Sequence, residues 1–332
     1  MIIDLSTFVW ANVDQLGPEF AARWRERIAR SGEQLDARPA EHERAMGCVD
    51  GAVVRGFRAD RLQARIPNEL VAEFVGKDPG RRLGVAGIDP LSADAFDQLD
   101  AAVALGLVGA NVSPVCSGFH PSHTVAMRLY ERCVDLALPL FVSVLEPLTG
   151  RAVLEFARPA AWDEVARSFP DLRIVISQLG HPFVDEALIL VGKHEHVYAD
   201  ISGVASRGWQ LYNALLSAAS YGVMEKLLFG SGFPADTPVR TIEALYRVNA
   251  FSQGTQLPSI PRSSITGIVE RNSLACLGIE AEISPRRDES ETEEPEVAVV
   301  DVVDRAPEPA VGRTDAAKGS WASGADPLRP LL

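Results

Sequence analysis

The chain has 332 residues, of which 45 are acidic and 32 are basic, so its formal net charge at pH 7 is −13. This charge argues against a protein whose main task is to neutralise nucleic-acid phosphates or an anionic lipid surface. The hydrophobic content of 47 % is typical of a globular protein with a sizeable core, and no apolar run approaches the roughly 18 residues of a membrane span. We therefore expect neither a nucleic-acid partner nor a membrane partner.

The chain begins with MIIDLSTFVW, which contains an acid at Asp4 and no basic leader. This start is typical of a first strand and not of a secretory signal, so we expect a cytoplasmic protein. The four cysteines are widely spaced and form no CxxC pair. The sequence therefore predicts neither a zinc knuckle nor a disulfide framework.

Eight short apolar runs, rich in branched side chains, alternate with helix-length segments between residues 1 and 280. The predicted strands are residues 2–5, 48–57, 83–88, 107–112, 140–145, 172–178, 197–201 and 226–230. This alternation is typical of repeated βα units around a parallel sheet. Since a closed barrel of this kind needs about 250 residues, the sequence predicts an α/β fold with a single (β/α)8 TIM barrel.

Two helix boundaries have local signals. Gly106 follows an amphipathic segment at a position where a helix is expected to stop. Thr237 offers a capping side chain, and Pro238 follows it at the first-turn position where proline is tolerated. We therefore expect one helix to end before Gly106 and another to begin at Pro238.

The composition changes after Glu280. Residues 281–332 contain 12 acidic side chains, 6 basic side chains and six prolines, with very few large apolar groups. Such a segment cannot bury enough apolar surface to offset the entropy lost on ordering. We therefore predict a barrel domain over residues 1–280 and an acidic, proline-containing disordered tail over residues 281–332.

Four motifs occur along the chain at the ends of predicted strands: IDLSTF (3–8), LPLFVS (138–143), SQLGHP (177–182) and FGSGFP (229–234). Their order and spacing resemble those of the amidohydrolase-related family (amidohydrolase 2). This family of TIM-barrel metallohydrolases includes decarboxylases of the aminocarboxymuconate-semialdehyde type. Its motifs place histidines and an aspartate around a metal. The resemblance implies the same barrel and a site at the carboxyl ends of the strands.

The metal ligands that the resemblance implies are replaced in this chain by Ser6, Phe8, Ser143, Gln178 and Gly232. A catalytic zinc site needs imidazole nitrogens or carboxylate oxygens at about 2 Å, from three or more side chains. The sequence therefore predicts no metal and no other cofactor. Our leading hypothesis is a catalytically inactive pseudoenzyme that acts as a ligand sensor, a scaffold or a partner of an active homologue.

The resemblance also indicates which side chains surround the barrel mouth. They are Ser6, Phe8, Trp10, Asn111, Ser143, Gln178 and Gly232. The aromatic side chains would either plug the mouth or leave a site for a small molecule. As partners we therefore expect a small-molecule ligand, together with assembly either into a homo-oligomer or into a hetero-oligomer with an active homologue.

An alternative keeps catalysis without a metal. In this alternative the protein is a hydrolase or a decarboxylase-like carbon–carbon lyase, and His181, Asp200 and Glu146 carry out general acid–base chemistry. Each residue also has a structural interpretation. His181 precedes a proline in a turn, Asp200 could brace a loop through backbone amides, and Glu146 could be a solvated loop residue.

Overall fold

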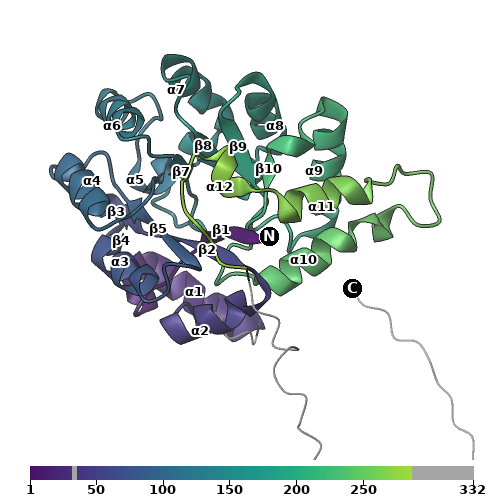
Figure 1. Cartoon of the computed structure of the whole chain (residues 1–332), viewed down its shortest axis with the longest axis horizontal. Coiled ribbons are helices and arrows are strands. Elements are labelled where there is room, and N and C mark those ends of the chain that lie inside the picture. The colour runs from purple at the N-terminus through teal and green to yellow at the C-terminus, as the bar shows by residue number, and fades with distance from the viewer. Residues whose placement is uncertain (32–35, 286–332) are drawn as a thin grey trace, which may run out of the picture. The chain divides into compact units, whose positions relative to one another are not determined.

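The computed structural model describes residues 1–31 and 36–285. Eight parallel strands lie side by side in the order in which they follow one another along the chain (Figure 1). They are β1 (Ile3–Thr7), β2 (Gly51–Arg55), β5 (Arg82–Gly87), β6 (Ala110–Val112), β7 (Leu140–Val142), β8 (Ile174–Ile176), β9 (Val197–Asp200) and β10 (Leu227–Leu228).

Hydrogen bonds between β1 and the segment after β10 close the sheet into a barrel. The Leu5 amide donates to the Phe229 carbonyl at 3.1 Å, and the Gly232 amide donates to the Ser6 carbonyl at 2.9 Å. The predicted (β/α)8 TIM barrel is therefore confirmed. One feature was not predicted, because the run 48–57 looked continuous in the sequence. That run ends as β2, and an antiparallel hairpin of β3 (Phe57–Ala59) and β4 (Ala64–Ile66) follows it.

Helices surround the ring of strands (Figure 1). The helices are α1 (Pro18–Ser31), α2 (Pro39–Ala45), α3 (Asn68–Gly76), α4 (Ala95–Ala104), α5 (Pro114–Ser117), α6 (Thr124–Asp135), α7 (Asp163–Ser168), α8 (Val184–Lys193), α9 (Gly208–Tyr221), α10 (Pro238–Tyr246), α11 (Arg262–Glu270) and α12 (Ser273–Cys276). Both predicted boundaries are confirmed, since α4 ends before Gly106 and the Thr237 side chain caps α10. None of the helices in the described residues is long and apolar enough to cross a membrane.

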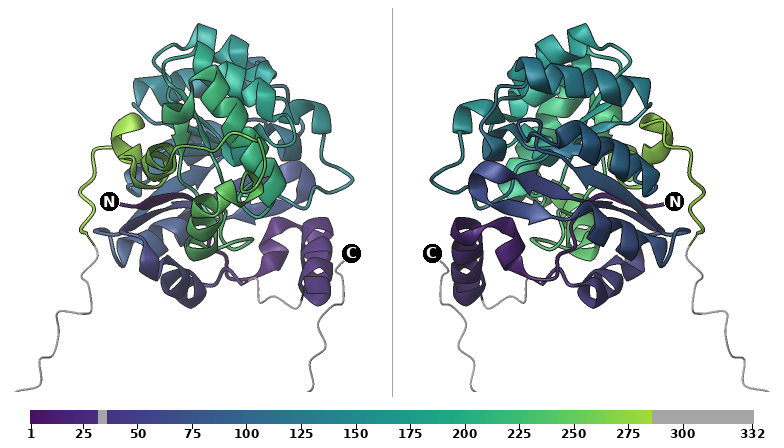
Figure 2. Two further views of the ribbon diagram at one scale, coloured as in Figure 1. Left: turned by 90° about the vertical axis from the view of Figure 1, so that its right-hand side faces the viewer. Right: turned by 90° about the vertical axis from the view of Figure 1, so that its left-hand side faces the viewer.

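Apolar side chains fill the amino-terminal half of the barrel. This cluster contains the inward-facing residues Leu5, Val53, Val85, Phe141, Val175 and Leu228, and α12 with the segment after it adds Leu274, Leu277 and Ile279. Figure 2 shows α12 and the N-terminus at one end of the barrel and α1 at the opposite end. Polar chemistry inside the barrel is therefore limited to the end that α1 covers.

The described chain continues past the predicted domain boundary. Ile283 packs against the apolar cluster, and the Ser284 amide donates to the Gly80 carbonyl at 2.9 Å. Contacts between the chain and the amino-terminal end of the barrel thus extend to about residue 284. The remainder of the predicted tail, from residue 286 onward, lies outside the described residues, so its disorder stays a prediction.

Candidate functional site

A cavity of about 80 Å³ lies at the carboxyl ends of the strands. Six of the seven residues predicted for the barrel mouth line it, namely Ser6, Phe8, Trp10, Ser143, Gln178 and Gly232. The positions at which the family resemblance implied metal ligands therefore surround one common opening. Asn111 is the exception. It is buried and does not line this cavity.

Helix α1 covers the cavity. Arg23 donates to the Leu148 carbonyl at 2.8 Å and Arg27 donates to the Ala235 carbonyl at 3.3 Å, so the helix bonds to the loops after β7 and β10. Its aromatic side chains pack on one another and on Trp10, with ring centroids 5.5 Å apart for Phe20 and Trp24 and 5.8 Å apart for Trp10 and Trp24. These contacts narrow the mouth and leave a small cavity beneath them.

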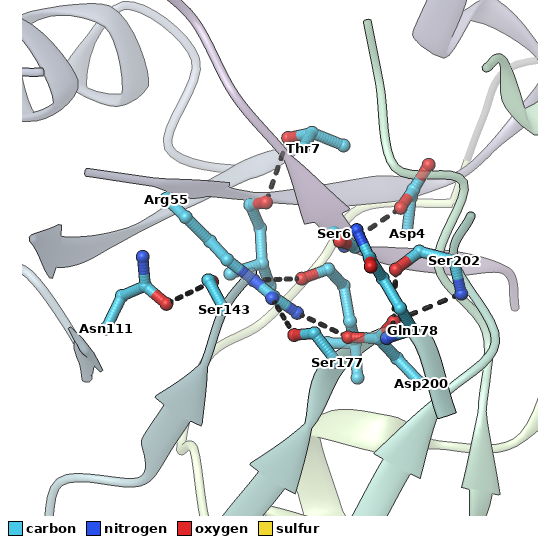
Figure 3. Close-up of polar contacts among 12 residues, drawn as sticks. Asp4, Ser6, Thr7, Arg55, Asn111, Ser143, Ser177, Gln178, Asp200 and Ser202 are labelled. Carbon is cyan, nitrogen blue, oxygen red and sulfur yellow. Dashed lines mark hydrogen bonds and ion pairs between the residues drawn. The ribbon is translucent and has the colours of Figure 1, made fainter. Parts of the chain in front are cut away.

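Arg55, at the end of β2, extends across the barrel interior to the far strands (Figure 3). Its side chain is 0 % exposed. The guanidinium donates to the Leu5 carbonyl at 2.8 Å, to the Ser177 hydroxyl at 2.5 Å and to Asp200 Oδ2 at 2.9 Å. It also lies 4.5 Å from the centre of the Phe141 ring. A fixed cation therefore occupies the floor of the cavity.

The Arg55–Asp200 ion pair is fully desolvated. Burial lowers the pKa of Arg55, and the neighbouring Asp200 carboxylate opposes that shift. Arginine nevertheless stays charged in proteins, so the carboxylate compensates a permanent buried charge. Asp200 Oδ1 accepts the backbone amides of Gln178 and Ser202, each at 3.1 Å, together with the Ser202 hydroxyl. Asp200 thus braces the loops that follow β8 and β9.

Polar contacts also fix the other substituted positions. Gln178 has a left-handed backbone with φ 56°, and its amide nitrogen donates to the Val144 carbonyl at 3.1 Å. Ser143 donates its hydroxyl proton to Asn111 Oδ1 (Figure 3). Asn111 in turn donates to the Gly56 carbonyl at 2.8 Å. Asn111 therefore supports Ser143 from beneath, which corrects its predicted place at the mouth.

The three candidate acid–base residues do not form one hydrogen-bonded set. Glu146 lines the cavity, but its Oε2 pairs with Arg207 at 2.6 Å. His181 Nδ1 is 3.6 Å from Glu146 Oε1, which exceeds hydrogen-bond length, and His181 lines a separate small recess. Asp200 is held in the ion pair with Arg55. The arrangement required by the metal-independent alternative is therefore not present.

The residues around the cavity do not fit a divalent metal. The five substituted positions provide two hydroxyls, one amide, one phenyl ring and one glycine. Within residues 1–31 and 36–285, no three His, Cys, Asp or Glu side chains lie together in a group that could hold an ion. The guanidinium of Arg55 would also repel a second cation placed in the same cavity.

Asp4 is fully buried behind Ser6. Its Oδ1 accepts the amides of Ser6 at 3.0 Å and of Ser231 at 2.9 Å, while its Oδ2 has no hydrogen-bond partner among the described residues. Burial raises the pKa of this carboxyl from 3.8 to about 6. Because the folded protein binds this proton more tightly than the unfolded chain, the stability that the protonated form contributes is lost as pH rises from about 4 to about 6.

Replacing Asp4 with Asn should remove this pH dependence and keep the Oδ1 acceptor. The unfolding free energy of Asp4→Asn, relative to that of the original chain, should rise by about 2–3 kcal/mol between pH 4 and pH 7. Urea denaturation at several pH values measures the difference. Two curves that stay parallel over this range would contradict the raised pKa.

His42 on α2 is a second buried titratable group. Its Nε2 lies 3.0 Å from the Thr7 hydroxyl, and that hydroxyl donates to the Val53 carbonyl at 2.9 Å. Nε2 must therefore carry the proton, and Nδ1 is left without a partner among the described residues. Burial lowers the pKa of His42 from 6.5 to about 3, so the folded protein keeps this ring neutral.

The unfolded chain binds a proton at His42 below about pH 6.5, and the folded protein does not, so stability falls as pH drops toward 3. Between pH 7 and pH 4.5 this residue should cost about 2–3 kcal/mol. The loss should be missing from His42→Leu in denaturant titrations at the two pH values. An unchanged acid sensitivity in His42→Leu would assign the effect to other groups.

Comparison with known proteins agrees with this fold. A family model described as Amidohydrolase matches residues 12–268. An uncharacterised TIM-barrel protein, Bb4693 of Bordetella bronchiseptica, has a TM-score of 0.63 at 20 % identity, and the match covers 83 % of this chain and 99 % of that chain. No curated protein matches the sequence.

Two further solved structures that resemble this chain are named as enzymes. One is a dihydroxybenzoic acid decarboxylase of Polaromonas sp. JS666 with bound manganese (TM-score 0.57, 16 % identity, 84 % of this chain and 97 % of that chain). The other is a probable 2-pyrone-4,6-dicarboxylic acid hydrolase of Acinetobacter baumannii (TM-score 0.56, 15 % identity, 83 % and 99 %). At these identities the likeness concerns the fold alone. Because the family model spans more than half of its residues, the chain belongs to the amidohydrolase family.

Proposed function

We propose that this protein is a metal-independent, catalytically inactive member of the amidohydrolase family that binds a small molecule at the barrel mouth. One observation carries the proposal. The buried guanidinium of Arg55, paired with Asp200, occupies the floor of the cavity that the five substituted positions surround. The fixed positive charge in this cavity thus belongs to the chain itself.

The side chains at the motif positions explain why we expect the protein to be inactive. A bound metal lowers the pKa of water from 15.7 to about 7 and so supplies a hydroxide nucleophile at neutral pH. The side chains of Ser6, Ser143 and Gln178 are neutral and offer no carboxylate or imidazole for that purpose. Arg55 stays protonated and cannot accept a proton from water. The cavity therefore contains donors that can hold a ligand and lacks a free base that can activate one.

The predicted roles as ligand sensor, scaffold or partner of an active homologue are compatible with this site. Assembly with a second copy or with a homologue remains part of the proposal, as does a location in the cytoplasm. We do not propose the metal-independent enzyme, because Asp200 is engaged by Arg55 and Glu146 is engaged by Arg207.

Turnover assays test the proposal. The purified protein, supplied with Zn²⁺ or Mn²⁺, should leave 2,6-dihydroxybenzoate and 2-pyrone-4,6-dicarboxylate unchanged at the rate of a protein-free blank. The 2,6-dihydroxybenzoate decarboxylase from Rhizobium serves as the positive control in the first assay. Metal-dependent turnover that disappears in Asp200→Asn would overturn the assignment of inactivity.

A further inference from the structure

The cavity floor has hydrogen-bond donors that the protein does not use. Arginine has five N–H donors. The contacts of Arg55 within the described residues use three of them, toward Leu5, Ser177 and Asp200. Two N–H groups therefore remain on a buried cation that lines the cavity. An unused donor on a buried charge is costly unless a ligand or water accepts its hydrogen bond.

Ser6 adds a further donor at the same place. Its backbone amide bonds to Asp4, whereas its hydroxyl has no hydrogen-bond partner within residues 1–31 and 36–285. The other hydroxyls on this floor are engaged, since Ser143 donates to Asn111, Ser202 donates to Asp200 and Ser177 accepts from Arg55. Gln178, which also lines the cavity, has an unpartnered acceptor in its buried Oε1. The other unused polar atoms at the floor are donors, and donors select an anionic or carbonyl-type acceptor.

The charges around the cavity also favour an anion. Both carboxylates that line it have a cationic partner, because Glu146 pairs with Arg207 and Asp236 pairs with Arg240. Arg27 lines the cavity as well, and it forms no ion pair with any residue in the part of the chain that the structure describes. Among the side chains that line the cavity, the arginines thus outnumber the carboxylates by one.

Size and shape restrict the ligand further. The cavity measures about 80 Å³, whereas sites for drug-sized ligands measure roughly 300–1,000 Å³. The aromatic side chains of Phe20 and Trp24 also line it and stack on each other. Room remains for a head group of only a few heavy atoms.

We propose that the cavity floor binds a small planar oxyanion of the carboxylate class, with Ser6 as the donor, Arg55 as the buried cation beneath the floor and Arg27 as the distal cation. The proposal rests on the proposed function, because it requires the floor to be free of metal, and it names the ligand class of that same site. The guanidinium then does two things. It holds the loops through Asp200, and its buried charge attracts the anion from beneath the cavity floor.

Direct binding measurements test this proposal. Titration of the full-length protein with ¹³C-labelled formate and acetate, followed by NMR line broadening at constant ionic strength, should show one saturable site. Benzoate should bind at least tenfold more weakly than acetate, because its ring exceeds the cavity. Ser6→Ala should weaken acetate binding about five- to tenfold through the lost hydrogen bond. Arg27→Gln should weaken it about threefold and reduce its dependence on salt.

Matched variants separate the site from non-specific binding. Ser263→Ala on α11 and Arg30→Gln on α1 change exposed residues of the same types and should leave acetate binding unchanged. Arg55→Lys should reduce binding more than tenfold where it folds, and the Ser6 and Arg27 variants decide the question where it does not. Equal binding by Ser6→Ala and Ser263→Ala, or no saturable binding at all, would overturn the proposal.

Failure here is distinguishable from failure of the proposed function. If the protein binds no acetate, and also shows no turnover and holds no metal, only the proposal of an oxyanion site is contradicted. Metal-dependent turnover contradicts the proposed function whether or not the protein binds acetate.

Discussion

Replacing Arg55 with Met should lower the free energy of unfolding by about 3–5 kcal/mol, because it leaves the buried carboxylate of Asp200 without its cation. The substitution also removes the hydrogen bonds to Leu5 and Ser177 and the contact with the Phe141 ring. Methionine fills part of the vacated volume without a charge. Urea denaturation at pH 7 gives the value directly.

A double-mutant cycle assigns this loss to the ion pair. Asp200→Asn keeps an Oδ1 acceptor for the amides of Gln178 and Ser202 and removes the charge. The double variant Arg55→Met/Asp200→Asn should therefore lose about 2–3 kcal/mol less unfolding free energy than the two single variants lose together. Arg132→Met breaks the exposed pair with Asp100 and should cost less than about 1 kcal/mol. Strictly additive losses at Arg55 and Asp200 would contradict the coupling.

Restoring histidines at the family positions should fail to restore tight metal binding while Arg55 is present. The test protein carries Ser6→His, Phe8→His, Ser143→His and Gln178→His. Adding Arg55→Gln to it should raise the affinity for Zn²⁺ about a hundredfold. This follows because the guanidinium repels the ion by on the order of 3 kcal/mol, and because Asp200 is released to face the metal. Calorimetric titration with zinc compares the two backgrounds.

Gly232 stays unchanged in both backgrounds for a geometric reason. Its φ of +78° is a conformation that residues with a side chain rarely adopt, and a Cβ there would lie 3.3 Å from the Ser202 Cβ. Thermal unfolding confirms that both test proteins are folded before zinc is added. Equal zinc affinity in the two backgrounds would show that Arg55 does not control access of a cation to the cavity.

The fold was predictable from the sequence because it depends on repeated local patterns. Apolar runs and turn signals recur eight times, and each run became a strand of the barrel. The strand ends were less accurate, as residues 172–178 show, where only Ile174–Ile176 are extended. The backbone of Gln178 turns left-handed directly afterwards, a conformation that a glutamine in a strand-like run does not signal.

The candidate site was predictable only in part. Motif positions identified the residues around the mouth, since a family signature fixes where on the barrel they lie. Arg55 lies outside all four family motifs, so the motifs do not identify it. A signal was present, because Val53 faces the apolar interior and strand alternation places Arg55 on the same side. Its partners are separated from it by 50, 122 and 145 residues along the chain, so no local pattern reveals them.

The contact of α1 with the mouth was also beyond sequence reasoning. The sequence predicts this helix only as one of the helix-length segments between strands. Its role in narrowing the cavity depends on where Arg23 and Arg27 find carbonyl partners, in the loops after β7 and β10. Side chains that bond to backbone groups of distant loops leave no periodic trace in the sequence.

Metal content tests the central claim most directly, because the claim is that Arg55 and not a bound ion supplies the positive charge of the barrel centre. The purified full-length protein is incubated with excess Zn²⁺ and Mn²⁺, passed through gel filtration and analysed by inductively coupled plasma mass spectrometry. We expect far less than one metal ion per chain, while the manganese-containing decarboxylase retains its ion in the same procedure. One zinc or manganese ion retained per chain, and lost on changing Gln178 to Ala, would contradict the claim.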